Sequence, residues 1–190
     1  MEANSQTYKN NLYGQIEEAY GKVVYSYTTQ ITHASKIYKR NKALKWAQII
    51  LSAISTGGFI GTLITEQMIS AWIGAFCSTA LLALTAYFKD LDLSAVYKSH
   101  LATSNKLWSV REEYMALLVD FETLSTEEIV SRRDALTIKT AEIYDEAPIT
   151  DSKSYAKAQE QLKNKESQFF TREELDKMLP IGLRKGNKNK

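Results

Sequence analysis

A stretch of 43 residues almost without charge lies between Lys45 and Lys89, and Glu66 is its only charged side chain. Glu66 divides the stretch into two uncharged runs of 20 and 22 residues. At a rise of about 1.5 Å per residue, twenty helical residues span about 30 Å, which is the thickness of the hydrocarbon core of a bilayer. We therefore predict two membrane-spanning helices, at 46–65 and 69–88.

A soluble alternative is a buried helical hairpin, which would need polar helices on every side of these 43 residues. The mean hydropathy of the chain, -0.31, is typical of soluble proteins only because 45 of its 46 basic and acidic side chains lie outside the stretch. A signal peptide fits poorly, since 45 residues precede the first span and a second span follows it. One cysteine excludes a disulfide scaffold, and two spans exclude a polytopic transporter. We expect a small membrane protein with most of its mass in water.

Basic side chains lie on one side of the predicted hairpin. Five of them precede the first span within residues 36–45, and Lys89 follows the second. The reversal between the spans, at 64–70, has no basic residue. Because short loops rich in Lys and Arg stay in the cytoplasm, we expect a multi-pass protein with both termini cytoplasmic.

Each predicted span has a face of small side chains spaced four residues apart. These positions are Ala53, Gly57 and Gly61 in the first span and Ala71, Ala75, Thr79 and Ala83 in the second. Small faces let helix backbones approach closely. Either the two faces close the hairpin within one chain, or they join the hairpins of several chains into a homo-oligomer.

A polar stripe occupies another side of the first span. At 100° per residue, an arc of about 120° contains Ser52, Ser55, Thr56, Thr62 and Glu66. The hydroxyls can bond to carbonyls of their own helix, or stripes from several chains could line a water-filled pore. The sequence has no ionisable group at mid-membrane, which argues against a proton pump, a voltage sensor or a coupled transporter. Glu66, at the outer mouth, could at most bias a pore towards cations.

Long cytoplasmic helices are predicted on both sides of the hairpin. Apolar side chains recur at spacings of three and four through 7–45, which predicts an amphipathic helix that runs to the first span. A heptad spacing through 93–121 predicts a helix that packs against a partner, for which the N-terminal helix is the obvious candidate. His100 and Thr103 interrupt that seam, so a simple coiled coil does not describe it.

Two further helices follow from start and stop signals. Ser125 and Glu128 form a capping-box pattern, which predicts a helix from there to about Tyr144. Pro148 then breaks the chain, and a polar helix is expected at about 152–170.

A short helix and a basic tail complete the chain. The capping pattern at 171–174 opens a helix that ends before Pro180, and the tail is expected to be disordered. The predicted fold class is all-α, a two-helix transmembrane hairpin with a long-helix cytoplasmic bundle or stalk. We divide it into an N-terminal cytoplasmic helix, the hairpin, a C-terminal cytoplasmic helical region and the tail, at 1–45, 46–88, 89–180 and 181–190.

We identify no catalytic, cofactor-binding or metal-binding residues and predict that the protein is not an enzyme. His33, His100 and Cys77 are too few and too scattered for a metal cluster. The glycine-rich segment 57–61 lacks the Lys-Ser/Thr pair of a phosphate-binding loop and lies in a predicted span. A net charge of +2 gives no reason to expect direct binding of nucleic acid.

The layout resembles the SLATT family, the two-transmembrane effectors found beside nucleotide second-messenger synthases, reverse transcriptases and related bacterial conflict systems. The resemblance covers about residues 30–150. It rests on the hairpin and on three segments, Lys36-Ile37-Tyr38-Lys39-Arg40-Asn41-Lys42, Tyr97-Lys98-Ser99-His100 and Ile143-Tyr144-Asp145-Glu146-Ala147-Pro148.

This resemblance implies an effector that oligomerises in the bacterial inner membrane and permeabilises it when triggered, so that the cell dies or is arrested during phage infection. Its expected partners are the lipid bilayer, further copies of itself, and a sensor such as a nucleotidyltransferase or reverse transcriptase encoded nearby. The alternative is a membrane-anchored helical scaffold that binds a partner without forming a pore.

Overall fold

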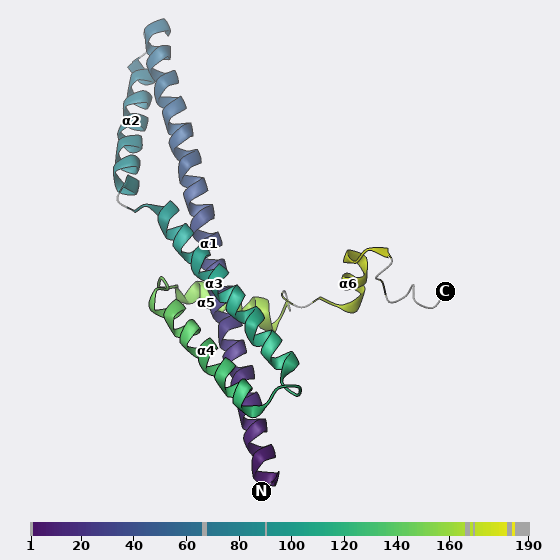
Figure 1. Cartoon of the computed structure of the whole chain (residues 1–190). Helices are drawn as coiled ribbons and strands as arrows, with labels where there is room; N and C mark the ends of the chain where they lie inside the picture. Colours follow the sequence, from purple (N-terminus) through teal and green to yellow (C-terminus); the bar gives the residue numbers. More distant parts are fainter. Residues whose placement is uncertain are drawn as a thin grey trace.

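The computed structural model describes residues 2–65, 68–89, 91–165, 168, 170–181 and 184, and it has no strand in these ranges. Its helices are α1 (Glu2–Thr65), α2 (Met68–Lys89), α3 (Leu93–Asp120), α4 (Thr126–Asp145), α5 (Ser152–Lys163) and α6 (Arg172–Met178). The all-α prediction is confirmed. Figure 1 shows α1 running the length of the molecule, with the hairpin at one end and the N-terminus at the other.

The amphipathic helix and the first span form one continuous helix, α1, of 64 residues. No proline occurs before Pro148, so nothing in this part of the sequence removes a backbone donor from the helix. At about 1.5 Å per residue, α1 is about 96 Å long. The membrane-facing and water-facing halves of the molecule therefore share a helix.

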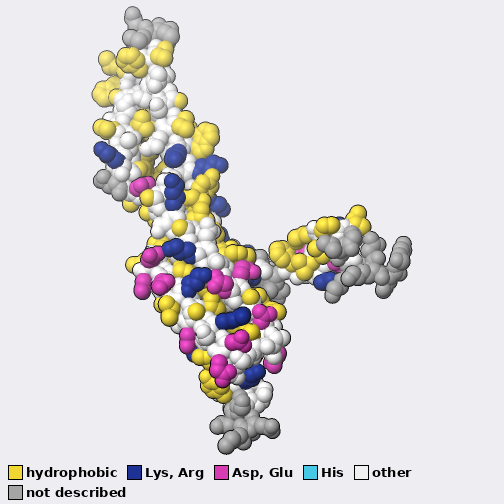
Figure 2. Space-filling view, in the orientation of Figure 1, with side chains coloured by type: hydrophobic (Ala, Val, Ile, Leu, Met, Phe, Trp, Pro, Cys, Tyr) yellow, Lys and Arg dark blue, Asp and Glu magenta, His cyan; other side chains and the backbone are white. Residues whose placement is uncertain are grey.

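The hairpin of α1 and α2 is not covered by the rest of the chain. The most apolar window of α1 has none of its residues buried, and that of the α2 segment has 11% buried. Figure 2 shows hydrophobic side chains on the surface of the hairpin and acidic side chains gathered mainly over the lower bundle. Both helices are long and apolar enough to cross a membrane. The alternative of a hairpin buried in a soluble bundle is therefore wrong.

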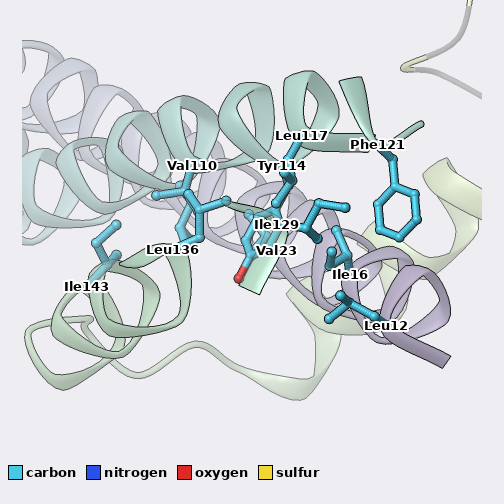
Figure 3. Packing of buried hydrophobic residues seen from close by; sticks show 11 residues of the cluster. Leu12, Ile16, Val23, Val110, Tyr114, Leu117, Phe121, Ile129, Leu136 and Ile143 are labelled. Atoms are coloured by element: carbon cyan, nitrogen blue, oxygen red, sulfur yellow. The ribbon is translucent and has the colours of Figure 1, made fainter. Parts of the chain in front are cut away.

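The lower half of α1 packs against α3 and α4 around one apolar core (Figure 3). Its members are Leu12, Ile16 and Val23 of α1, Leu107, Val110, Tyr114 and Leu117 of α3 with Phe121 after it, and Ile129, Leu136 and Ile143 of α4. The heptad positions predicted in 93–121 supply five of these residues, which confirms that α3 packs against α1. At the upper end of α3, Val96 is 39% exposed, so the buried seam begins at His100.

The capping box at the start of α4 is confirmed. The Ser125 hydroxyl accepts a hydrogen bond from the Glu128 backbone N–H at 3.3 Å, and the Ser125 backbone N–H donates to the Glu128 carboxylate at 3.0 Å. Helix α4 ends at Asp145, one residue beyond the predicted Tyr144.

Replacing Ser125 with alanine should lower the free energy of unfolding by about 1 kcal/mol, because the orphan N–H of Glu128 loses its acceptor. The matched control is Ser131→Ala on an exposed face of α4, which should change it by less than about 0.5 kcal/mol. Chemical denaturation of the full-length protein in detergent micelles, followed by circular dichroism, measures both. Equal effects of the two substitutions would contradict the capping role.

The C-terminal elements differ partly from the prediction. Helix α5 ends at Lys163 rather than near 170, whereas α6 begins after its Thr171 cap and ends before Pro180, as predicted. In Figure 1, α6 is set apart from the bundle. Most of the tail predicted to be disordered, 181–190, lies outside the described residues.

Candidate functional site

The backbones of the two spans lie close together at Gly58 and Gly74. A Cβ atom on Gly58 would lie 3.0 Å from the Ser70 carbonyl oxygen and 3.1 Å from the Gly74 Cα atom. A Cβ on Gly74 would lie 3.4 Å from the Ser55 carbonyl oxygen. A Cβ on Gly58 would be too close to the backbone of α2, whereas a Cβ on Gly74 would make ordinary van der Waals contact. Neither glycine belongs to the predicted small faces, although Gly74 is the only glycine in the predicted second span.

The predicted small faces lie largely outside this contact. A Cβ on Gly57 would have no described atom within 4 Å, and on Gly61 it would lie 3.7 Å from the Ser70 hydroxyl oxygen. The remaining positions are exposed: Ala53, Ala71, Ala75, Thr79 and Ala83. Gly61 thus lies beside α2, and the other positions are exposed on the hairpin surface, so their role in helix packing stays a prediction. The residues of α1 that contact α2 include Ser55, Gly58 and Gly61, which are spaced three residues apart.

The polar stripe of the first span is divided between two surfaces. The Ser55 hydroxyl faces α2, where it hydrogen-bonds to the Ser78 hydroxyl. Ser52 and Thr56 are exposed, and the Thr56 hydroxyl donates to the Ser52 carbonyl at 2.9 Å. The Thr62 side chain and Glu66 lie outside the described residues. Ser52 and Thr56 are thus the described stripe residues that face away from the hairpin contact.

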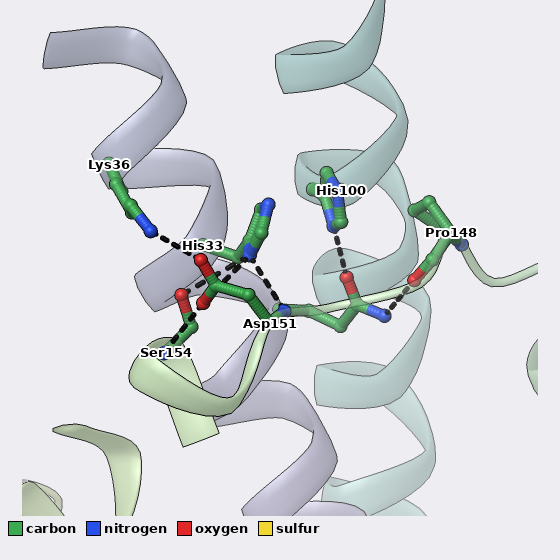
Figure 4. A network of polar contacts seen from close by, with 7 residues as sticks. His33, Lys36, His100, Pro148, Asp151 and Ser154 are labelled. Atoms are coloured by element: carbon green, nitrogen blue, oxygen red, sulfur yellow. Dashed lines mark hydrogen bonds and ion pairs between the residues drawn. The ribbon is translucent and has the colours of Figure 1, made fainter. Parts of the chain in front are cut away.

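Below the hairpin, a polar layer joins α1, α3 and the start of α5 (Figure 4). We define it as Gln30, His33, Lys36, His100, Pro148, Asp151 and Ser154. Its members come from three segments of the chain, at 30–36, 100 and 148–154. The two positions that interrupt the predicted α3 seam are both buried, and His100 belongs to this layer.

Asp151, at the start of α5, contacts two residues of α1. Its carboxylate caps α5 by accepting from the Ser154 N–H at 2.7 Å, and it forms an ion pair with Lys36. Hydrogen bonds from Lys36 and Ser154 hold the pKa of Asp151 well below its usual range, so it is charged at neutral pH. The Asp151 backbone N–H donates to His33 Nδ1 at 3.3 Å. His33 is therefore an acceptor at Nδ1, which leaves its proton on Nε2 when the ring is neutral.

His100 is buried against His33, with the ring centroids 4.4 Å apart. Its Nδ1 lies 2.5 Å from the side-chain oxygen of Gln30, whose amide nitrogen donates to the Pro148 carbonyl at 3.1 Å. His100 Nδ1 is thus the donor. Burial, followed by the nearby His33, lowers the pKa of His100 to about 4. The ring is therefore neutral at pH 7.

Histidine, serine and aspartate here do not form a nucleophilic triad. The Ser154 hydroxyl lies 3.2 Å from His33 Nδ1, and the Asp151 carboxylate lies 3.5 Å from that same nitrogen. A triad needs the base to accept from serine on one ring nitrogen and donate to the carboxylate from the other. Within the described ranges, no group of three or more His, Cys, Asp or Glu side chains could hold a metal ion. The contacts of the polar layer join α1, α3 and the start of α5.

One local pattern in the sequence indicates part of this layer. Asp151 lies three residues before Ser154, which is the spacing of a helix N-cap and indicates the start of α5. Nothing local indicates that His33 and His100 meet.

One protein family matches both the hairpin and the helical region below it. Residues 12–174 match SLATT_4, described as SMODS and SLOG-associating 2TM effector domain family 4. The match covers most of the chain, so the chain belongs to this family, and the resemblance seen in the sequence is confirmed. Neither the curated proteins nor the solved structures contain a match. The chain is a membrane effector of the kind that acts in conflict systems.

Proposed function

We propose that this two-transmembrane effector assembles into homo-oligomers in the bacterial inner membrane and permeabilises it when triggered. Death or arrest of the infected cell would then protect neighbouring cells from phage. A single hairpin has two spanning helices and cannot enclose water, so association between chains is the step that creates activity.

The observation that carries this proposal is the outward direction of the small side chains. Gly57 and Ala53 on α1, and Ala75 and Thr79 on α2, lie on the surface of the hairpin rather than in its internal contact. Small faces in lipid favour close approach of another helix. Ser52 and Thr56 are also exposed on α1 and supply hydroxyls that water in a lumen would contact.

The cytoplasmic bundle is the part that controls assembly in this proposal. Helix α1 passes from the bundle core into the hairpin without a break, so a shift of α1 against α3 and α5 reaches the membrane. A trigger acts by binding one arrangement of these helices better than the other. The cluster of basic residues before Trp46 favours a cytoplasmic bundle with both termini inside. A sensor encoded nearby, such as a nucleotidyltransferase or reverse transcriptase, would supply the trigger.

Release of a trapped dye tests the proposal. Full-length protein is reconstituted at increasing protein-to-lipid ratios into liposomes of phosphatidylethanolamine and phosphatidylglycerol that contain carboxyfluorescein. Release should rise more steeply than linearly with protein density, because several chains build one pore. No release at densities where chemical cross-linking detects oligomers would contradict the proposal and favour the membrane-anchored scaffold.

A further inference from the structure

A lysine-rich pocket lies between α1 and α5, beside the polar layer. It has a volume of about 580 Å³, within the range of sites that hold small molecules. Four of its lining residues are lysines, Lys36 and Lys39 from α1 and Lys153 and Lys157 from α5, and none is acidic. We propose that this pocket binds a small molecule or headgroup that carries two or more phosphate groups.

The placement of the four lysines is unfavourable without an anion. Lys36 and Lys39 are three residues apart on α1, and Lys153 and Lys157 are four apart on α5, so each helix sets two like charges on one face. Lys153 also lies in the first turn of α5, where the helix dipole disfavours a cation. A bound polyanion removes both penalties.

The charge of the pocket sets the class of ligand. The Asp151 carboxylate is paired with Lys36, while Lys39 and Lys153 have no ion pair within 4 Å among the described residues. A monovalent anion would leave most of the positive charge of these lysines unpaired. Two or more phosphate groups carry several negative charges in a compact shape and can pair with all of them. Lysine ammonium groups bind phosphate well as point charges.

The ligand would also act on the attachment of α5 to α1. Lys36 lies in the pocket and pairs with Asp151, which caps α5 and contacts His33. Phosphate groups in the pocket compete with Asp151 for Lys36 and so weaken this attachment. The role of the ligand as the trigger rests on the proposed function, but its binding does not.

Isothermal titration of full-length protein in detergent micelles with sodium tripolyphosphate tests the site. Wild-type protein should bind, and Lys153→Gln/Lys157→Gln should bind at least about tenfold more weakly through the loss of two charge-assisted contacts. The matched control is Lys98→Gln/Lys163→Gln, which removes the same charge from exposed positions outside the pocket and should bind like wild type. Absence of binding by the wild type, or equal weakening in both double variants, would overturn the proposal.

Asp151→Asn gives a test in the opposite direction. Asparagine keeps the cap of α5, but it frees Lys36 from its carboxylate partner. Tripolyphosphate should therefore bind a few-fold more tightly to this variant. Unchanged or weaker binding to a folded Asp151→Asn protein would overturn the competition between ligand and Asp151.

Nanodiscs separate the two sources of phosphate. Lys39 lies seven residues before Trp46, about 10 Å along the helix, so a lipid headgroup or a soluble molecule can reach the pocket. If cardiolipin nanodiscs weaken tripolyphosphate binding relative to phosphatidylcholine nanodiscs in the wild type, and not in Lys153→Gln/Lys157→Gln, the site binds the headgroup. Equal affinity in both nanodiscs assigns it to a soluble ligand. Dye release without tripolyphosphate binding would leave the proposed function standing and remove only this site.

Discussion

Gly57→Leu should abolish most dye release while leaving the hairpin folded. A Cβ atom at position 57 would meet no described atom of α2 within 4 Å, so a larger residue here does not push the two spans apart at its Cβ. In an oligomer joined through the small face, the same leucine holds neighbouring helices apart. Loss of about 1.4 kcal/mol of association free energy per contact gives a tenfold loss, and a ring of chains has several contacts. We expect release to fall at least about tenfold at a fixed protein-to-lipid ratio.

The adjacent glycine provides the matched control. In Gly58→Leu the new Cβ would lie 3.0 to 3.2 Å from backbone atoms of Ser70 and Gly74, which cannot move aside as a side chain can. This variant should therefore lower the thermal stability of the hairpin in detergent, whereas Gly57→Leu should not. Wild-type release by Gly57→Leu would contradict assembly through this face. Equal destabilisation by both variants would contradict the packing of the hairpin.

Acidification from pH 7 to pH 4 should lower the free energy of unfolding of the bundle by about 3 kcal/mol, because His100 resists protonation in the folded chain. Its pKa of about 4 in the folded chain lies below the usual 6.5, so the unfolded chain binds a proton that the folded chain excludes. This contribution is fully present above pH 6.5 and is lost as the pH falls towards 4. Asp151 acts in the same direction, but only below its ordinary pKa of 3.8.

His100→Gln isolates this effect. Glutamine can still donate a hydrogen bond towards Gln30, but it does not titrate. The variant should lose its stability less steeply than wild type between pH 6.5 and pH 4, in denaturation of the full-length protein in micelles. His33→Gln is the comparison variant: burial, the larger cause of the lowered pKa of His100, remains, so this variant should keep most of the wild-type pH slope. If wild type and His100→Gln have the same pH slope, His100 is not held neutral by burial.

The parts of the fold that follow from local rules could be predicted from the sequence. The spans follow from an uncharged stretch, α4 and α6 from capping boxes, and the core face of α3 from a heptad spacing. Each of these signals lies within one helix. The continuity of α1 was missed because a change from polar to apolar composition suggests two elements, although no residue there ends a helix.

The contacts between helices could not be predicted in the same way. Gly57 and Gly58 differ by 100° around α1. The four-residue repeat of small side chains contains Gly57, whereas the glycine that contacts α2 in the structure is Gly58. Similarly, the Lys36 and Asp151 ion pair joins residues 115 apart in sequence. Such pairs depend on how the helices pack, and no local pattern encodes that arrangement.

The most direct test of the account is whether the hairpin resides in lipid. Membranes from cells that produce the full-length chain are washed with high salt and alkaline carbonate, and the chain is then followed with and without detergent. We expect the chain to stay in the membrane pellet through both washes and to enter solution only with detergent. Release of the intact chain by salt alone, as a dissolved monomer, would contradict it.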